Sequence, residues 1–107
     1  MTLNDLKVIA YHNCQSKGFW DEERNMGEMI ALCHSELSEA LEEIRKNPNP
    51  LFEYSDGGKP CGFISELGDC IIRILDICGY LNVDIERIIL DKMQYNSKRE
   101  YKHGKVF

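Results

Sequence analysis

The chain has 107 residues, with 43% hydrophobic and 29% charged side chains and a formal net charge of −5. This composition is typical of one soluble globular domain and excludes disordered, collagen-like and membrane-spanning classes. The acidic balance argues against nucleic acid as a general partner. We therefore expect a single domain over residues 1–107, in the cytoplasm because no targeting segment is visible, and without a membrane partner.

The charge is divided unevenly along the chain. Residues 92–107 carry a net charge of +4, which leaves −9 on the rest. An acidic body with a basic tail suggests a site that handles ions, although a solvated tail is the simpler interpretation of the charge alone. The five cysteines are odd in number and form no C-x-x-C motif, so we expect neither a disulfide framework nor a zinc ribbon.

Hydrophobic residues at helical spacing predict two helices in the first half of the chain. The first covers about residues 3–16, with Thr2 as its N-cap and Asp5 three residues later. The second covers about residues 25–46 and ends at an Asn-Pro-Asn-Pro segment. Residues 47–62 contain all three prolines of the chain, so they form a long loop that either closes over a ligand or only connects two helices.

The same spacing predicts a third helix over about residues 63–80 and a fourth over about residues 84–99. On the fourth helix, Ile85, Ile88 and Ile89 define the face that we expect to point inward. Strand signals are nearly absent, because the chain has no clean alternation and no hairpin dipeptide between apolar runs. The sequence therefore predicts an all-α protein, a four-helix bundle.

A repeated motif places two carboxylates on each of the two central helices. Residues 35–44, SELSEALEEI, align with residues 65–74, SELGDCIIRI. Glu36 and Glu39 on one helix thus correspond to Glu66 and Asp69 on the other. At about 100° per residue, both pairs border the apolar stripe of their helix. If the two helices pack side by side, their four carboxylates converge at one rim of the interface.

Four converging carboxylates repel one another unless a cation compensates them. Oxygen-only ligands suit Mg²⁺, with Mn²⁺ as a substitute. A di-iron bundle requires Glu-x-x-His, and His34 lies well round the helix from Glu36 and Glu39. The pattern predicts a Mg²⁺ site, and the alternative for either pair alone is a solvated helix face.

The inward face of the fourth helix changes from apolar to polar along one line. After Ile88 and Ile89, helical spacing brings Lys92, Asn96 and Arg99. Basic residues also stabilise the last turn of a helix through its dipole, so this feature alone leaves both interpretations open. Beside a metal site, however, such side chains suit a polyphosphate, because they stabilise the charge that grows on its leaving group.

Together these motifs resemble the MazG-like nucleoside triphosphate pyrophosphohydrolases of the all-α NTP pyrophosphatase superfamily. The resemblance lies in Glu36-x-x-Glu39 followed by Glu66-x-x-Asp69, in residues 58–62 and in the tail from residue 92 to residue 105. It implies the bundle of that superfamily and Mg²⁺-dependent hydrolysis of a nucleoside triphosphate, standard, deoxy or non-standard, to the monophosphate and pyrophosphate. Such an enzyme cleans or controls a nucleotide pool and assembles as a homodimer or homotetramer.

The resemblance also implies roles for single residues. Glu36, Glu39, Glu66 and Asp69 would be metal ligands. Glu36 by preference, with Glu39 as the other catalytic candidate, would orient or deprotonate the attacking water. The residues expected to bind substrate are His12, Trp20, Asn25, Lys92, Asn96, Arg99, Lys102 and Lys105. For His12 and Trp20, a core or interface role is an equal alternative.

The chain departs from the family pattern at Ser35, where many members have a further glutamate, so a two-metal arrangement is not implied. Glu43 is a substitute, although with Arg73 it would equally form a salt-bridged face. Two other functions remain open. One is a non-catalytic helical module whose acidic face binds a basic partner or a structural cation. The other is a superfamily relative that acts on another phosphorylated nucleotide, such as phosphoribosyl-ATP or an alarmone.

Overall fold

The computed structural model describes residues 1–48, 53–54 and 57–107 and contains four α-helices in that part of the chain: α1 (Leu3–Ser16), α2 (Met26–Lys46), α3 (Phe63–Leu81) and α4 (Ile85–Ser97). A 3₁₀ turn, η1 (Tyr101–Gly104), follows α4. The predicted all-α class is confirmed. None of these helices combines the length and the hydropathy needed to cross a lipid bilayer.

The helix boundaries follow from local capping chemistry. Thr2 caps α1 in a capping box with Asp5, as the sequence predicts. Asn25 caps α2 by accepting a hydrogen bond from the Glu28 N–H, and Asp84 caps α4 through the Arg87 N–H. The third helix ends at Asn82, whose left-handed backbone (φ 54°) suits a C-terminal cap.

The predicted loop over residues 47–62 contains a short β-ladder in its described part. Strand β1 (Glu53–Tyr54) pairs antiparallel with β2 (Pro60–Cys61). Two-residue strands are too short to give an alternating pattern, so the sequence analysis could not detect them. The remainder, residues 49–52 and 55–56, lies outside the described residues, and with it the question of closure over a ligand.

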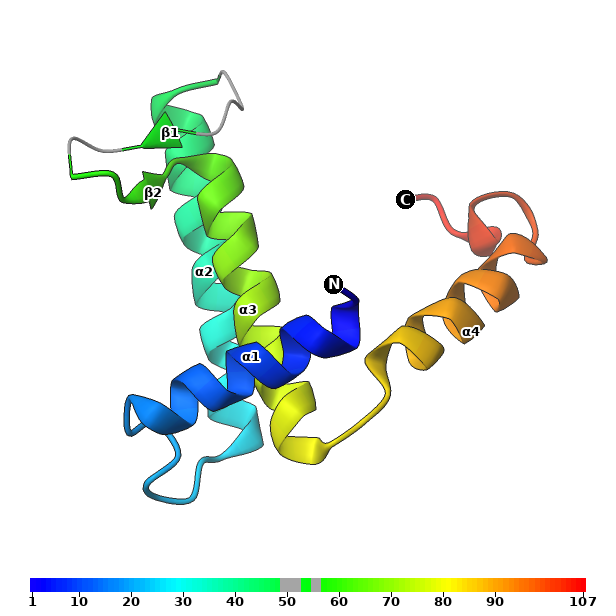
Figure 1. Ribbon diagram of the computed structural model, residues 1–107. Helices are drawn as coiled ribbons and strands as arrows, with labels where there is room; N and C mark the ends of the chain where they lie inside the picture. Colours follow the sequence, from blue (N-terminus) through cyan, green and yellow to red (C-terminus); the bar gives the residue numbers. More distant parts are fainter. Residues whose placement is uncertain (49–52, 55–56) are drawn as a thin grey trace.

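Helices α2 and α3 lie side by side, and α1 crosses them near the C-terminal end of α3 (Figure 1). The core between these three helices is thin. Its buried apolar side chains are Ala10, Met29, Ala40, Cys70, Leu75 and Cys78. The five cysteines are all free, and Cys70 Sγ donates to the Cys33 carbonyl oxygen across the α2–α3 contact (3.5 Å).

Helix α4 projects away from the other three (Figure 1). The radius of gyration, 16.3 Å, exceeds the value of about 13 Å expected for a compact chain of this length. Ile88 and Ile89 are 47% and 38% exposed, so the prediction that this face points inward is wrong within one chain. Periodicity identifies an apolar stripe but does not say which chain covers it.

The start of α4 and the residues just before it are fixed to α1 by hydrogen bonds of two α1 residues. Asn4 donates from its backbone N–H to Glu86 Oε1 (2.8 Å) and from Nδ2 to Asp84 Oδ1 (2.9 Å), and its Oδ1 accepts from the Ile85 N–H (3.2 Å). Lys7 is buried and donates from Nζ to the Val83 carbonyl oxygen (2.7 Å). These bonds set the direction in which α4 leaves the bundle.

The predicted apolar stripes are wider than the faces that one chain buries. Large apolar side chains remain at least one third exposed on every helix, among them Leu6, Ile9, Leu37, Leu41, Ile71 and Ile72. A hollow of about 350 Å³ between α1 and α3 is lined by four of them, Leu6, Ile9, Ile71 and Ile72, together with the buried Ala10 and Leu75. One chain therefore leaves apolar surface uncovered on this side of the molecule.

Two glycines of α3 give a matched pair of variants. A Cβ at Gly79 would overlap Tyr11 Cβ and lie 3.1 Å from the Lys7 carbonyl oxygen, whereas a Cβ at Gly68 has no heavy atom within 4 Å. We expect Gly79→Ala to lower the free energy of unfolding by about 1–3 kcal/mol, because α1 must shift. Gly68→Ala should raise it by up to about 1 kcal/mol through helix propensity. Equal stability of the two variants in urea denaturation would contradict the close α1–α3 packing.

Candidate metal centre

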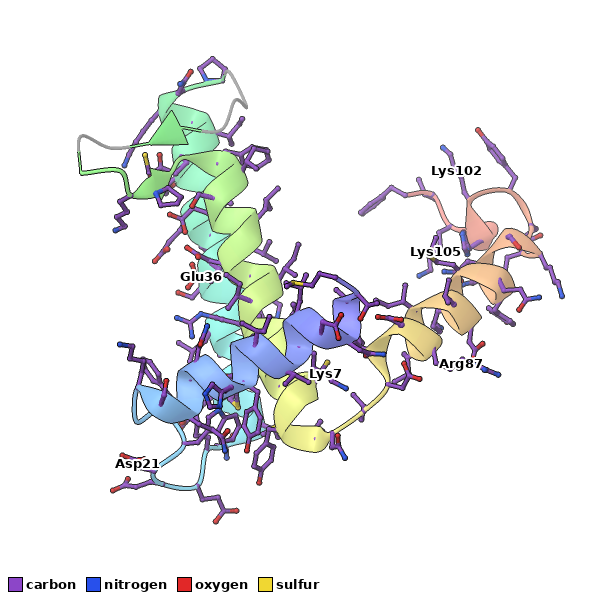
Figure 2. All side chains as sticks on the ribbon, viewed as in Figure 1. Lys7, Asp21, Glu36, Arg87, Lys102 and Lys105 are labelled. Atoms are coloured by element: carbon purple, nitrogen blue, oxygen red, sulfur yellow. The ribbon has the colours of Figure 1, made fainter. Side chains whose placement is uncertain are left out.

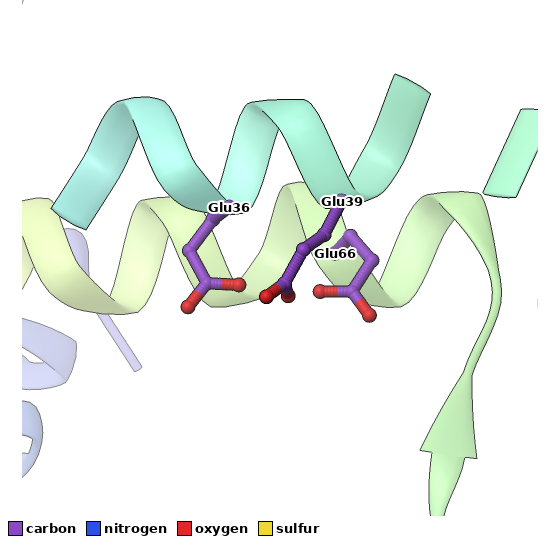
Figure 3. A group of neighbouring side chains, drawn as sticks. All are labelled: Glu36, Glu39 and Glu66. Atoms are coloured by element: carbon purple, nitrogen blue, oxygen red, sulfur yellow. The ribbon is translucent and has the colours of Figure 1, made fainter. Parts of the chain in front are cut away.

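Three carboxylates from α2 and α3 meet on one side of the helix pair. Glu36 and Glu39 come from α2 and Glu66 from α3, and carboxylate oxygens from all three lie within 4.8 Å of one another. Figure 3 shows the three side chains directed to the same region. We call them the acidic triad. The predicted convergence of carboxylates from the two central helices is thus present for three of the four residues.

Glu36 is the most buried member of the triad, at 8% exposure. Its Oε1 accepts a hydrogen bond from Arg73 Nε on α3 at 2.8 Å, which is also an ion pair. The Arg73 guanidinium lowers the pKa of Glu36, against the opposing effect of burial. Glu36 is therefore an ionised carboxylate near neutral pH.

Glu66 has the opposite electrostatic character. Burial, together with the neighbouring Glu39 carboxylate, raises the pKa of Glu66 to about 7. Its Oε2 is buried and has no hydrogen-bond partner among the described residues. A buried carboxylate oxygen without a partner costs free energy, and a cation is one ligand that would relieve the cost.

Asp69, the fourth predicted ligand, is exposed and lies outside the triad. It still acts on the site, because its charge contributes to the raised pKa of Glu66. A hollow of about 330 Å³ opens beside Glu39 and Glu66 and is also lined by Glu42 and Glu43. Glu43 forms an ion pair with Lys46 at 3.8 Å, whereas Arg73 pairs with Glu36, so the salt-bridged face that Glu43 was predicted to form with Arg73 is not found among the described residues.

The donor set of the triad suits a hard divalent cation. All three groups offer carboxylate oxygens, which are the ligand atoms that Mg²⁺ and Mn²⁺ prefer. Glu66 Oε2 is a buried ligand atom that no hydrogen bond from a described residue occupies. His34 is exposed and does not join the cluster, as expected from its helical position. Within the described residues, these oxygens would hold the metal.

Four of the five residues that were predicted to bind substrate in the C-terminal part of the chain gather at the far end of α4. A hollow of about 650 Å³ is lined by Asn96, Arg99, Lys102 and Lys105, together with His103, Val106 and Phe107. Lys92 and Arg99 both lie near the Tyr95 ring, each 5.7 Å from its centroid. We call Lys92, Asn96, Arg99, Lys102 and Lys105 the basic arm. Figure 2 shows Lys102 and Lys105 on a part of the molecule well separated from Glu36, so one chain does not bring the arm to the triad.

The three remaining predicted residues lie around the α1–α2 connection. His12 is exposed on α1, and the Asn25 side chain is used as the N-cap of α2. Trp20 stacks on Tyr80 with ring centroids 4.2 Å apart, and its Nε1 donates to Asp76 Oδ1 at 2.8 Å. These contacts give Trp20 a packing role in the single chain, as in the alternative to substrate binding.

Sequence reasoning missed the structural roles of Asp76 and Arg73. Asp76 is 4% exposed and also accepts from Arg24 Nη1 at 3.2 Å, so it fixes the α1–α2 connection to α3. A charged residue within the apolar run Ile74-Leu75-Asp76-Ile77 is a signal that could have revealed it, because buried charges require partners. Arg73 offers the same kind of signal, seven residues after Glu66 and so on nearly the same face of α3.

Comparisons of this chain with protein-family models, with curated proteins and with solved structures found no match.

The raised pKa of Glu66 predicts how the metal-free protein responds to pH. The folded chain retains a proton that the unfolded chain releases, so stability is highest below the unfolded pKa and falls as pH rises toward 7. Glu66→Gln removes the titrating group and with it this fall in the free energy of unfolding. We expect it to raise the free energy of unfolding by about 1–3 kcal/mol at pH 8 in EDTA, and by less than about 1 kcal/mol at pH 5.

Urea denaturation at the two pH values measures this difference. Glu42→Gln is the control, because its side chain is 59% exposed and ion-paired with Arg45 on the surface. That variant should differ from the wild type by less than about 0.5 kcal/mol at either pH. A pH-independent effect of Glu66→Gln would contradict the raised pKa.

Proposed function

We propose that this chain is a Mg²⁺-dependent hydrolase that converts a nucleoside triphosphate to the monophosphate and pyrophosphate. The observation that carries the proposal is the acidic triad, which leaves one buried oxygen of Glu66 without a partner. The motif resemblance and the cationic end of α4 support it. An acidic group and a basic group on one small chain are what a metal-bound polyphosphate requires.

A bound Mg²⁺ would withdraw charge from phosphate oxygens and acidify a nearby water. The protein residues supply the rest. Glu36 is held ionised by Arg73, so it is a hydrogen-bond acceptor for a water but a weak base. Its role is therefore to orient the water toward the α-phosphorus. Glu39 is exposed and accessible to solvent, so it is better placed to accept the proton.

The basic arm acts at the other end of the reaction. As pyrophosphate leaves the α-phosphorus, negative charge grows on its oxygens, and the arm's Lys and Arg side chains would stabilise this charge. Because the arm and the triad of one chain are separate, we propose that a second copy supplies the arm. The exposed apolar faces of α1, α3 and α4 favour such a homodimer or homotetramer.

The reaction is tested with a panel of ribo- and deoxyribonucleoside triphosphates in Mg²⁺ or in EDTA, with the products resolved. We expect monophosphate and pyrophosphate in Mg²⁺ and no turnover in EDTA. Glu39→Gln should lower kcat by a factor on the order of 100 or more, because a ligand and proton acceptor is lost. Asp69→Asn tests the predicted ligand outside the triad, and Glu42→Gln, on the rim of the same hollow, should retain activity.

Near-full activity of Glu39→Gln would exclude the triad as the active site. Diphosphate and orthophosphate as products would contradict attack at the α-phosphorus. No turnover of any triphosphate, combined with an increase in Tm on adding Mg²⁺, would favour another phosphorylated substrate or the non-catalytic acidic module.

The shared site predicts complementation between two inactive variants. Glu39→Gln disables the triad and Arg99→Ala disables the arm. A mixed dimer then has one site with both defects and one intact site, so co-expression should restore about a quarter of wild-type activity, with light scattering reporting the oligomer. If triad and arm of the same chain worked together, the mixture would stay inactive.

A further inference from the structure

Arg73 is a cation built into the acidic triad. It lies on α3 and its Nε reaches across to Glu36 Oε1 on α2 at 2.8 Å. The Glu36 side chain is 11% exposed and that of Arg73 is 38% exposed, so the carboxylate is shielded while part of the guanidinium faces solvent. The two terminal nitrogens of Arg73 have no hydrogen-bond partner among the described residues.

The pair compensates charge in the absence of metal. Three carboxylates within 4.8 Å repel one another strongly, and the neighbouring Glu39 carboxylate is one cause of the raised pKa of Glu66. Lys46 is paired with Glu43 at the rim, so Arg73 is the cation in direct contact with a member of the triad within the described part of the chain. It therefore holds Glu36 in position before any metal enters.

The Arg73–Glu36 ion pair also opposes the binding of a divalent ion to the triad. A cation that takes Glu36 as a ligand competes with the guanidinium for its carboxylate and is repelled by the guanidinium charge. An anion close to Arg73 would remove this opposition, because the terminal nitrogens, which have no partner in the described part of the chain, suit a phosphate.

We propose that Arg73 is a positioning residue that holds Glu36 in the metal-free protein and weakens binding of a free divalent cation. On this basis the ion binds well only together with an anionic phosphate, to which Arg73 transfers the hydrogen bond that it donates to Glu36. This inference rests on the proposed function, since it requires that the triad binds a divalent ion.

Binding of Mn²⁺ alone, followed by the electron paramagnetic resonance signal of the free ion, tests the proposal. Arg73→Gln should bind Mn²⁺ about tenfold more tightly than the wild type, because an adjacent positive charge is removed. Arg73→Lys keeps the charge and should remain within about threefold of the wild type. Arg87→Gln makes the same charge change on α4, where Arg87 pairs with Asp91, and should leave the affinity unchanged within about twofold.

A purely structural role for Arg73 would give the opposite sign, since loss of Glu36 positioning would weaken Mn²⁺ binding. Equal or weaker binding by Arg73→Gln, with the wild type still binding, would overturn the inference and leave the proposed function intact. Absence of Mn²⁺ binding by the wild type and by every variant, with pyrophosphate present as well as without it, would overturn both.

A measurement on the wild type avoids dependence on how well a variant folds. The Arg73 Nε–H resonance, assigned by ¹⁵N NMR, should shift as Mg²⁺ is added. The shift should occur at a lower Mg²⁺ concentration when pyrophosphate is also present. A resonance that does not move while the Glu36 carboxylate signal does would overturn the proposed competition.

Discussion

The packing of α2 against α3 forces like charges together, and much of the structure depends on how that repulsion is compensated. The two helices bury Ala40 and Cys70 between them, and the same register places Glu36, Glu39 and Glu66 at the edge of the contact. Sliding either helix to separate the carboxylates would expose this small core. The protein instead neutralises the cluster locally, with an arginine on one carboxylate and a raised pKa on another.

A second constraint acts at the opposite end of α3. The αL turn at Asn82, the Asn4 hydrogen bonds and the buried Lys7 fix α4 in a direction that leads away from the bundle. A freely jointed arm would lose more conformational entropy on docking than one already held in place. The separation of the acidic body from the basic arm is thus part of the fold, and under the proposed function a second copy would have to supply the missing charge.

The sequence predicted what depends on local chemistry and on one helix at a time. The four helices, the Thr2 cap and the convergence of Glu36, Glu39 and Glu66 follow from periodicity, capping and spacing, and the structure contains them. The exposure of Ile88 and Ile89 and the partners of Arg73 and Asp76 depend on how helices are placed relative to one another. A helical period of 3.6 identifies a face but carries no information about the element, or the chain, that covers it.

The raised pKa of Glu66 and the Arg73–Glu36 ion pair both reduce the repulsion within the triad, but different events would undo them. The proton on Glu66 is held with a pKa of about 7, so it leaves readily near neutral pH when a cation approaches. The Arg73–Glu36 pair has no such proton to release, because an arginine stays charged. Another anion that pairs with the guanidinium would compensate for the loss of its ion pair with Glu36. A metal ion that binds the triad would have to displace the Glu66 proton and to separate the Arg73–Glu36 ion pair. Because a phosphate assists only the second step, such a site would bind a metal–phosphate complex in preference to a free ion, which is the discrimination that a nucleotide hydrolase needs.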